Sequence, residues 1–340
     1  MPGPRRRRIP TTRARVCRVA DGLSGLRLIA DIGGTNARFA IAQGGRYSKL
    51  EHVPVSKYAS LHDAISDYLE GLPSDMRPSE AAIDVAGPVT GDQIALTNLG
   101  WSFSISELQQ KLGLHSLRVF NDFAATAMAV PYLPASDCFL IGPARPDAKG
   151  PIGIIGPGTG LGVGSLVPDA GGWALVPGEG GHVTMPTTTE EEDRIIAVLR
   201  ARWDHVSAER VLSGSGLVNL YEAICAIEGV TPQSLSPADV TDHAIHKTDA
   251  ICVKAFAHFC EMLGTVAGDL ALTVGATGGI YIAGGILLRF KEAFADSGFR
   301  ARFESKGRFR AFLERIPTHL IMQESPALLG LANIPSGQAS

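Results

Sequence analysis

An asparagine and an aspartate stand side by side at positions 121 and 122, between an apolar segment and a run of small residues. This pattern predicts a buried strand ending at Phe120 and a helix over 124–129. Groups at the carboxyl end of a strand in an open α/β sheet face the ligand crevice. A carboxylate held there can accept a proton from a substrate hydroxyl. Asn and Asp are also favoured helix N-caps, so the pair alone supports either interpretation.

Two turns rich in glycine and threonine, Asp31-Ile-Gly-Gly-Thr35 and Gly156-Pro-Gly-Thr-Gly160, have the composition of phosphate loops. Glycine lets a ligand approach the backbone, whose N–H groups can point at anionic oxygens. One such turn is common in hairpins, but two in equivalent positions can hold a nucleotide's phosphates from opposite sides. The predicted contacts are Gly33, Gly34, Thr35 and Asn36 in the first turn, and Gly156, Gly158, Thr159 and Gly160 in the second.

Asp31 begins the first of these turns and is the predicted magnesium residue. Mg²⁺ dehydrates reluctantly, so the contact would run through water. A turn-capping aspartate is the alternative. The glycines at 284 and 285 follow an apolar segment, and a flat adenine could lie on such bare backbone. A plain strand-to-helix turn would give the same pattern.

Glu179, His182 and Glu209 lie in glycine-rich or strand-end surroundings. A polyol needs several convergent donors and acceptors, because an unpaired hydroxyl in a buried site is costly. The three side chains therefore form a candidate sugar site, although a single loop glutamate is usually a solvated charge. A zinc site at His182 is disfavoured because no cysteine cluster lies near it.

The elements that must position these groups repeat along the chain. Segments 26–31 and 37–42 read as strands flanking the first glycine turn, and 152–155 and 163–167 flank the second. A strand, and not a helix, follows each turn, which argues against a dinucleotide-binding fingerprint. The repetition indicates an internal duplication in an α/β fold. Further strands are expected near 52–55, 81–86, 279–283 and 319–322, helices over 61–69, 189–203, 217–227, 248–274 and 287–295 and from 104 and 326, a loop over 137–150 and a turn over 175–183.

Length and composition favour a globular protein of one large or two smaller domains, with 340 residues of which 45% are hydrophobic. The first 24 residues carry seven arginines and one aspartate, a charge of +6, so the whole-chain charge of −3 leaves −9 on the remainder. Such an acidic body disfavours nucleic acid as a partner. The longest apolar runs are too short for a membrane span. Five scattered cysteines suggest reduced thiols in a cytoplasm.

The arginine-rich head over residues 1–24 has no apolar core of a secretory signal. We expect a disordered extension outside the fold, with a basic targeting or binding arm as the alternative.

The motifs together resemble the bacterial ATP-dependent glucokinase family, in the actin–hexokinase–heat-shock ATPase group of folds. The resemblance covers about residues 26–333 and rests on motifs that are specific only in combination: Asp31 to Arg38, Gly87 to Gly91, Thr97-Asn98, Asn121 to Phe123, Gly156 to Gly162, Pro177 to His182, Ser207 to Gly214 and Ile282 to Ile286. The related zinc-containing sugar kinases and regulators carry a cysteine cluster after a similar Gly-His turn, and this chain lacks it. The arginine-rich head departs from the family pattern.

The resemblance implies a two-lobed actin/hexokinase-like fold, a duplicated ribonuclease H-like architecture with the active site between lobes. It implies transfer of the γ-phosphoryl group of ATP to the 6-hydroxyl of glucose, with Mg²⁺, in a cytoplasmic homodimer. Asp122 would be the base, and Asn98, Asn121, Glu179, His182 and Glu209 would bind glucose. The dipole of the helix after Asn121 and nearby donors would keep the Asp122 carboxylate ionised.

We expect a small domain from 25–132 plus about 323–340, and a large domain from 133–322. Two other classes stay open: a kinase for another hexose or amino sugar on the same fold, and a non-catalytic nucleotide switch, filament protein or regulator. The second class does not need a carboxylate at position 122.

Overall fold

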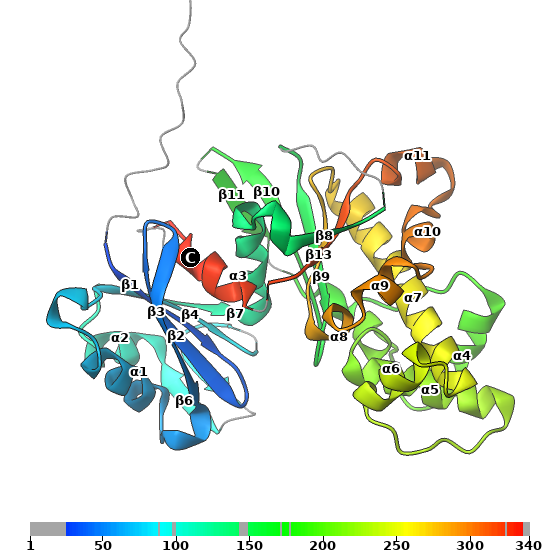
Figure 1. Cartoon of the computed structure of the whole chain (residues 1–340), viewed down its shortest axis with the longest axis horizontal. Helices are drawn as coiled ribbons and strands as arrows, with labels where there is room; N and C mark the ends of the chain where they lie inside the picture. Colours follow the sequence, from blue (N-terminus) through cyan, green and yellow to red (C-terminus); the bar gives the residue numbers. More distant parts are fainter. Residues whose placement is uncertain are drawn as a thin grey trace, which may run out of the picture.

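Two lobes, each with its own mixed β-sheet, make up the molecule (Figure 1). The structure, a computed structural model, describes residues 25–87, 89–96, 100–142, 149–170, 172–176, 178–323 and 325–335. The arginine-rich head lies outside the described residues.

The first sheet contains five strands in the order β3-β2-β1-β4-β7. β1 pairs antiparallel with β2 and parallel with β4, and β4 pairs parallel with β7. The bounds are β1 Arg27–Ile32, β2 Asn36–Gln43, β3 Arg46–Pro54, β4 Glu80–Val85 and β7 Ser116–Asn121. A separate hairpin joins β5 Gln93–Leu96 to β6 Trp101–Ser104.

The second sheet has the order β11-β10-β9-β12-β13-β8. From β11 to β13 it repeats the strand directions of the first sheet, with two antiparallel pairs followed by two parallel pairs. The turns 33–35 and 158–160 occupy equivalent places, between β1 and β2 and between β9 and β10. The predicted duplication is therefore confirmed. The bounds are β8 Cys138–Ile141, β9 Ile152–Pro157, β10 Leu161–Asp169, β11 Gly172–Val176, β12 Gly279–Ile282 and β13 Thr318–Ile321.

Two strands lie where the sequence predicts other structure. The expected loop over 137–150 contains β8, which pairs antiparallel with β13 at the edge of the second sheet. Part of the expected turn over 175–183 belongs to β11, which pairs with β10. Both strands are short, and their pairing partners supply the order that their own sequences do not signal.

The helices follow the predicted capping signals closely. The hydroxyls of Ser60, Ser104 and Thr189 each accept a hydrogen bond from the backbone N–H three residues on, as N-caps do. Their helices are α1 Leu61–Glu70, α2 Ile105–Lys111 and α4 Glu190–Arg200. The remaining helices are α3 Asp122–Ala129, α5 Gly214–Glu228, α6 Pro237–Ile245, α7 Ala250–Val274, α8 Gly285–Leu288, α9 Lys291–Ala295, α10 Phe299–Glu304, α11 Arg310–Leu313 and α12 Pro326–Ala332.

One predicted helix is wrong as a single element. The segment 287–295 forms parts of α8 and α9, separated where Phe290 leaves helical geometry with φ −132° and ψ 36°. Helices α6, α10 and α11 have no counterpart in the sequence prediction. The latter two have six and four residues, too short for a helical period to stand out.

Helix α7 is the central helix of the second lobe. Its 25 residues are long and apolar enough to cross a membrane by length and composition alone. In the fold, however, 67% of its most apolar window is buried, and it packs against α5, α6 and α10. Most of this apolar window is therefore buried inside the protein.

Helix α3 lies between the two sheets, and this position explains its run of small residues (Figure 1). Ala125 packs in the apolar cluster of the first sheet with Ile29, whereas Ala127 packs in a cluster of the second sheet with Ile154. Helix α12 crosses α3 so closely that a side chain at Gly330 would overlap the carbonyl of Ala125. The α3–α12 pair thus joins the lobes and fixes the start of α3 at their junction.

Candidate active site

The N-cap of α3 is Asn121, and Asp122 is the first residue within the helix. The Asn121 Oδ1 accepts hydrogen bonds from the N–H groups of Phe123 at 2.9 Å and Ala124 at 3.3 Å. Its Nδ2 donates to the Gly87 carbonyl at 3.1 Å. An asparagine amide has two acceptor sites and two N–H donors, so one N–H remains for a ligand. Because Asn121 caps the helix, the Asp122 carboxylate is not needed for that task.

Burial raises the pKa of Asp122 above its ordinary value of 3.8, and the negative charge of Asp31 adds to the shift. The Phe123 N–H, which donates to the carboxylate at 2.7 Å, acts in the opposite direction. The helix dipole and donors by themselves predict a stabilised anion. Desolvation outweighs them because the carboxyl group lies at the junction of the lobes. A raised pKa makes Asp122 a stronger base when it is ionised.

Three carboxyl groups lie in a row across the carboxyl ends of three parallel strands. Asp31 in β1 is in register with Asp84 in β4, and Asp84 is in register with Phe120 in β7. The charges of Asp31 and Asp122 both act on Asp84, so Asp122, the first residue of α3 after the end of β7, lies close to the other two carboxyls. Asp31 also forms an ion pair with Arg38 at 2.7 Å.

Asp84, the middle member of this row, was not predicted from the sequence. Its signal was a single charged residue inside an apolar strand, and the structure shows it to be 0% exposed. Neither carboxyl oxygen accepts a hydrogen bond from a described residue. Burial raises the pKa of Asp84 well above 3.8, with Asp31 and then Asp122 adding to the shift and Arg38 opposing it.

This shift predicts a pH-dependent cost in stability. The folded state binds the Asp84 proton more tightly than the unfolded state, so this stabilisation is complete below the ordinary pKa and is lost as the pH rises through the raised pKa. We expect Asp84→Asn, measured by thermal unfolding without divalent metal, to be more stable than the parent protein at pH 8. The difference should raise Tm by roughly 3 °C or more and should vanish at about pH 4.

Asp92→Asn is the matched control, because the Ser104 hydroxyl holds the pKa of Asp92 below its ordinary value. Its effect on stability should have the opposite sign: a loss at pH 8 that disappears as the pH falls through the lowered pKa. Equal stability of Asp84→Asn and the parent protein at both pH values would contradict a buried, proton-holding Asp84.

The two glycine turns are built differently despite their equivalent places. In the first, Gly33 N–H donates to the Asn36 carbonyl at 3.0 Å, and residues 34–36 are exposed. In the second, Gly158 N–H donates to the Gly160 carbonyl at 2.8 Å, and Thr159 is exposed. Both turns therefore present backbone and hydroxyl groups to solvent, as a phosphate-binding turn must.

Packing against α3 explains some glycines near the second turn. Side chains at Gly156 or Gly162 would overlap the Phe123 ring, so the absence of a side chain at both positions makes room for Phe123. Gly158 has open space around it and is the glycine of this turn that a ligand could approach. Phe123 thereby holds the start of α3 against β9 and β10.

The Gly284-Gly285 segment lies directly beside the second turn. Gly284 has φ +120°, and a side chain there would overlap the Pro157 carbonyl. The Ala283 N–H donates to the Ile155 carbonyl at 2.9 Å. The structure therefore brings together two of the three segments predicted to contact the nucleotide.

The segments that carry Glu179, His182 and Glu209 meet at the start of β10. The Glu209 Oε2 accepts a hydrogen bond from the Leu161 N–H at 2.9 Å. The turn that carries Glu179 and His182 packs through Gly181 on the Leu161 carbonyl. Ala208 N–H joins the two turns by donating to the Val183 carbonyl at 2.8 Å.

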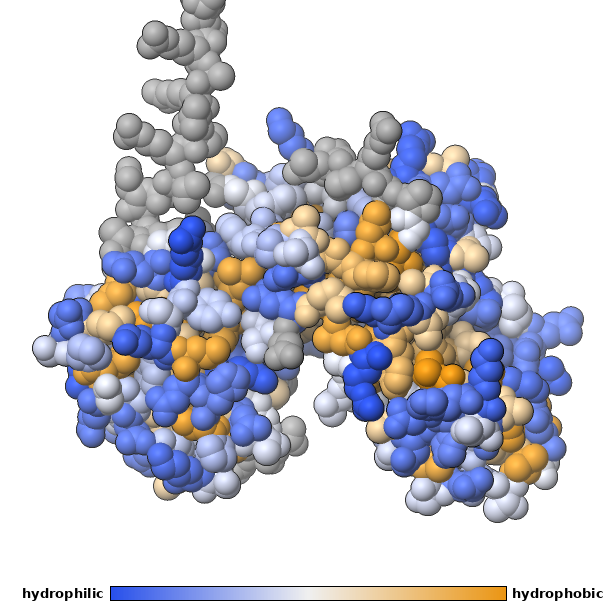
Figure 2. All heavy atoms as spheres, in the orientation of Figure 1, coloured by the Kyte–Doolittle hydropathy of each residue, from blue (hydrophilic) through white to orange (hydrophobic). Residues whose placement is uncertain are grey.

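The side chains of these three residues differ in their exposure and in their hydrogen bonds. Those of Glu179 and His182 are 80% and 59% exposed, and they lie 3.9 Å apart between Oε2 and Nε2. The Glu209 carboxylate already accepts one hydrogen bond, from the backbone N–H of Leu161 next to the second turn. Asn98 lies outside the described residues. Figure 2 shows the molecule hollowed between the lobes, and the predicted residues come from both sides of this division.

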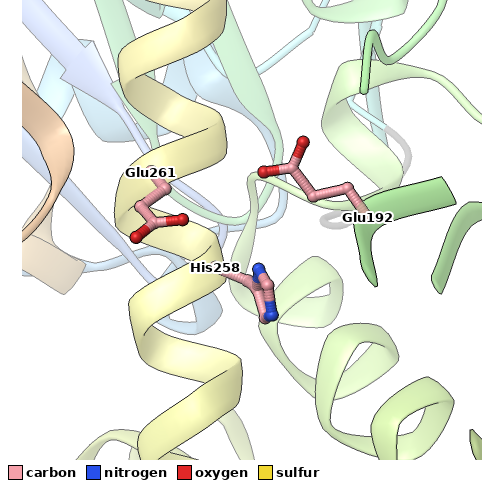
Figure 3. Close-up of side chains that lie close together, drawn as sticks. All are labelled: Glu192, His258 and Glu261. Carbon is pink, nitrogen blue, oxygen red and sulfur yellow. The ribbon is translucent and has the colours of Figure 1, made fainter. Parts of the chain in front are cut away.

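A second group of ionisable side chains lies far along the chain from these segments, in α4 and α7 (Figure 3). Ligand atoms of Glu192, His258 and Glu261 all lie within 4.8 Å of one another. The Arg302 guanidinium, from α10, pairs with Glu192 at 2.6 Å and with Glu261 at 2.9 Å. Positive charge is thus already supplied here by an arginine, and we interpret the group as an ion-pair network.

Comparisons with known proteins agree on one family. A family model described as Glucokinase matches residues 28–337. A glucokinase from Nitrobacter hamburgensis is 66% identical over 313 residues, covering 92% of this chain and 98% of its own. The crystal structure of a glucokinase from an Antarctic psychrotroph superposes with a TM-score of 0.85 at 38% identity, covering 91% of this chain and 98% of that chain.

A more distant structure has the same fold. The glucokinase of the ROK family from Streptomyces griseus, solved in complex with glucose and AMPPNP, has a TM-score of 0.60 at 19% identity, covering 92% of this chain and 99% of that chain. The fold class expected from the sequence motifs is therefore confirmed as that of the two-lobed sugar kinases.

Proposed function

The chain belongs to the glucokinase family and is an ATP-dependent glucose kinase, and we propose that Asp122 is the general base of its reaction. The observation that carries the proposal is the division of labour at the start of α3. Asn121 caps the helix, which leaves Asp122 as a buried carboxylate at the junction of the lobes. The 6-hydroxyl of glucose would pass its proton to Asp122 as its oxygen attacks the γ-phosphorus of ATP.

For the sugar, we propose that Glu179, His182 and Glu209 bind ring hydroxyls, with Asn98 and the remaining Asn121 N–H beside them. Glu209 and the Glu179–His182 turn converge on β10, and Phe123 packs on the same strand, so Asp122 and the sugar residues share one support. Phosphoryl transfer depends mostly on positioning and electrostatics, so this shared support would matter as much as the base.

For the nucleotide, we propose that the two glycine turns hold the phosphates of ATP and that Gly284-Gly285 lies under the adenine. Their exposed N–H and hydroxyl groups support this assignment. Asp31 would hold Mg²⁺ through water, and the all-oxygen composition of the carboxyl row fits this hard cation. When bound, Mg²⁺ would neutralise charge that develops on the phosphoryl oxygens.

We further propose that the lobes divide into a small domain from 25–132 plus about 323–340 and a large domain from 133–322, which close over glucose and exclude water. The protein would act in the cytoplasm as a homodimer at the first step of glycolysis, without nucleic acid or a membrane as partner. The burial of α7 and the free state of the four described cysteines support a cytoplasmic protein.

A coupled ADP-release assay over a panel of hexoses and amino sugars tests this function. We expect glucose to give the highest kcat/KM and ADP release without sugar to be slow. A higher kcat/KM for another sugar would favour the alternative hexose kinase. ADP release that no sugar stimulates would favour the non-catalytic switch or regulator.

The sugar assignment makes a separate prediction. We expect Glu179→Gln and Glu209→Gln to raise the KM for glucose by roughly tenfold, because a charged hydrogen bond to a hydroxyl contributes about 1.5–3 kcal/mol. The KM for ATP should change less, as steady-state kinetics with each substrate varied will show. Lys111 pairs with Glu107 on an exposed helix at 3.9 Å, so Glu107→Gln serves as a control with unchanged kinetics. An effect confined to ATP would remove Glu179 and Glu209 from the sugar site.

A further inference from the structure

Asp84 is a fully buried carboxyl group near the carboxyl end of β4. A fully buried carboxyl group normally has a partner, since an unpaired charge in the interior is strongly destabilising. Asp84 is 0% exposed, and neither of its oxygens accepts a hydrogen bond from a described residue. A group of this kind either holds a proton or awaits a cation.

The location of Asp84 favours a cation. Its carboxyl group faces the proposed magnesium residue, because Asp31 and Asp84 are paired in register on adjacent parallel strands. The Asp31 carboxylate lies within hydrogen-bonding reach of Asp84, and the charge of Asp122 acts on it from the other side. The next residue, Val85, belongs to the apolar cluster on the opposite face of the sheet.

The protein itself provides little positive charge for three carboxyl groups. Arg38 is the cation whose charge acts on Asp84 among the described residues, and its guanidinium already pairs with Asp31 at 2.7 Å. One arginine against Asp31, Asp84 and Asp122 leaves an excess of acidic groups in a low-dielectric environment. A divalent ion would neutralise this excess of negative charge. The single positive charge of Arg38 is already present and does not.

We propose that Asp84 is a further carboxylate ligand of the divalent cation that accompanies ATP, held jointly with Asp31. Mg²⁺ is usually bound by one or two carboxylates together with substrate phosphates and water, and this pair supplies two carboxylates in adjacent register. This proposal rests on the proposed kinase function. It adds a ligand that the sequence motifs did not include.

Manganese binding tests the proposal without a measurement of catalysis. Mn²⁺ replaces Mg²⁺ at oxygen sites, and its unbound fraction can be followed by electron paramagnetic resonance, with and without AMPPNP. We expect Asp84→Asn to weaken Mn²⁺ binding by at least about tenfold, within the range seen when groups of a metal site are removed. Asp84→Ala provides a second variant, and circular dichroism will show that both are folded.

Two further variants separate this proposal from the others. Asp92→Asn changes an aspartate held by Ser104 and Ser106, outside the carboxyl row, and should leave Mn²⁺ affinity unchanged. Asp31→Asn should weaken Mn²⁺ binding if Asp31 holds the metal. Unchanged Mn²⁺ affinity in folded Asp84→Asn and Asp84→Ala would overturn the role of Asp84.

The failures of the two proposals can be distinguished. Weaker Mn²⁺ binding in Asp31→Asn but not in the Asp84 variants would leave the proposed function intact and refute the present inference. Weaker binding in the Asp84 variants together with normal kcat in Asp122→Asn would support the metal ligand and refute Asp122 as the base.

Discussion

Replacing Asp122 with asparagine is expected to lower kcat for glucose phosphorylation by about 10²- to 10⁴-fold, the usual contribution of a general base. Asparagine keeps the size of the side chain but cannot accept the proton of the attacking hydroxyl. Glucose should still bind, because its ring hydroxyls are assigned to other residues. Stopped-flow or coupled steady-state assays give kcat, and calorimetry gives the affinity for glucose.

Stability measurements separate this effect from a structural one. Asn121 caps α3 and retains its bonds to the N–H groups of Phe123 and Ala124 in the Asp122→Asn variant. The variant should therefore keep the Tm of the parent protein to within a few degrees. Asn121→Ala removes the cap and should destabilise the protein by roughly 1 kcal/mol. A near-normal kcat in Asp122→Asn would refute the assignment of the base.

The pH dependence of the parent enzyme gives an independent check on the base. Burial raises the pKa of Asp122, so kcat should fall with decreasing pH at values above the ordinary aspartate range. The ionised form is the active one, which fixes the direction of this limb. A rate that stays constant down to the ordinary pKa would contradict the environment described for Asp122.

Replacing Arg302 with methionine is expected to lower the free energy of unfolding by about 3–5 kcal/mol, the usual loss when one partner of a buried ion pair is removed. Glu192 is fully buried, and its carboxylate pairs with Arg302 at 2.6 Å. The bonds from Thr188 to Glu192 would remain, at 2.6 Å from its N–H and 3.0 Å from its hydroxyl. They cannot replace the positive charge. Urea unfolding of the purified variant measures the effect.

A second substitution can identify the buried charge as the cause. Adding Glu192→Gln to Arg302→Met removes the unpaired carboxylate, so the double variant should recover a large part of the lost stability. Arg289→Met is the control, because Arg289 pairs with Asp242 at 3.7 Å with a 62% exposed side chain and should contribute little. No recovery in the double variant would attribute the loss to packing of the arginine side chain instead.

Local chemistry determined much of what the sequence predicted correctly. The caps at Ser60, Ser104 and Thr189 depend on a hydroxyl and an N–H three residues apart, so they can be predicted directly from the sequence. The two strand–turn–strand units are also local, and their repetition revealed the duplicated fold. The motifs also identified the family, because their combination is more specific than any one of them.

The predictions failed where distant segments decide the structure. Strand β8 is short and pairs with β13, far along the chain. Helices α8 and α9 are separated at Phe290, whose backbone is not helical, in a segment whose apolar pattern continues through both helices. In each case a long-range contact or a single dihedral angle overrode the local pattern, and neither can be predicted from that pattern.

At the site, the sequence by itself determined which groups are available, and it predicted a role in phosphoryl transfer for Asp31, Asp122, the glycine turns and the polar residues near β10. Only the tertiary structure decided how these groups are arranged. It made Asn121 the cap, directed Glu209 to the N–H of Leu161 48 residues away, and packed Phe123 on Gly156 and Gly162. It also buried Asp84 between two other carboxyl groups. Spacing along a chain fixes which groups are available, but desolvation and charge depend on every neighbour that folding brings near.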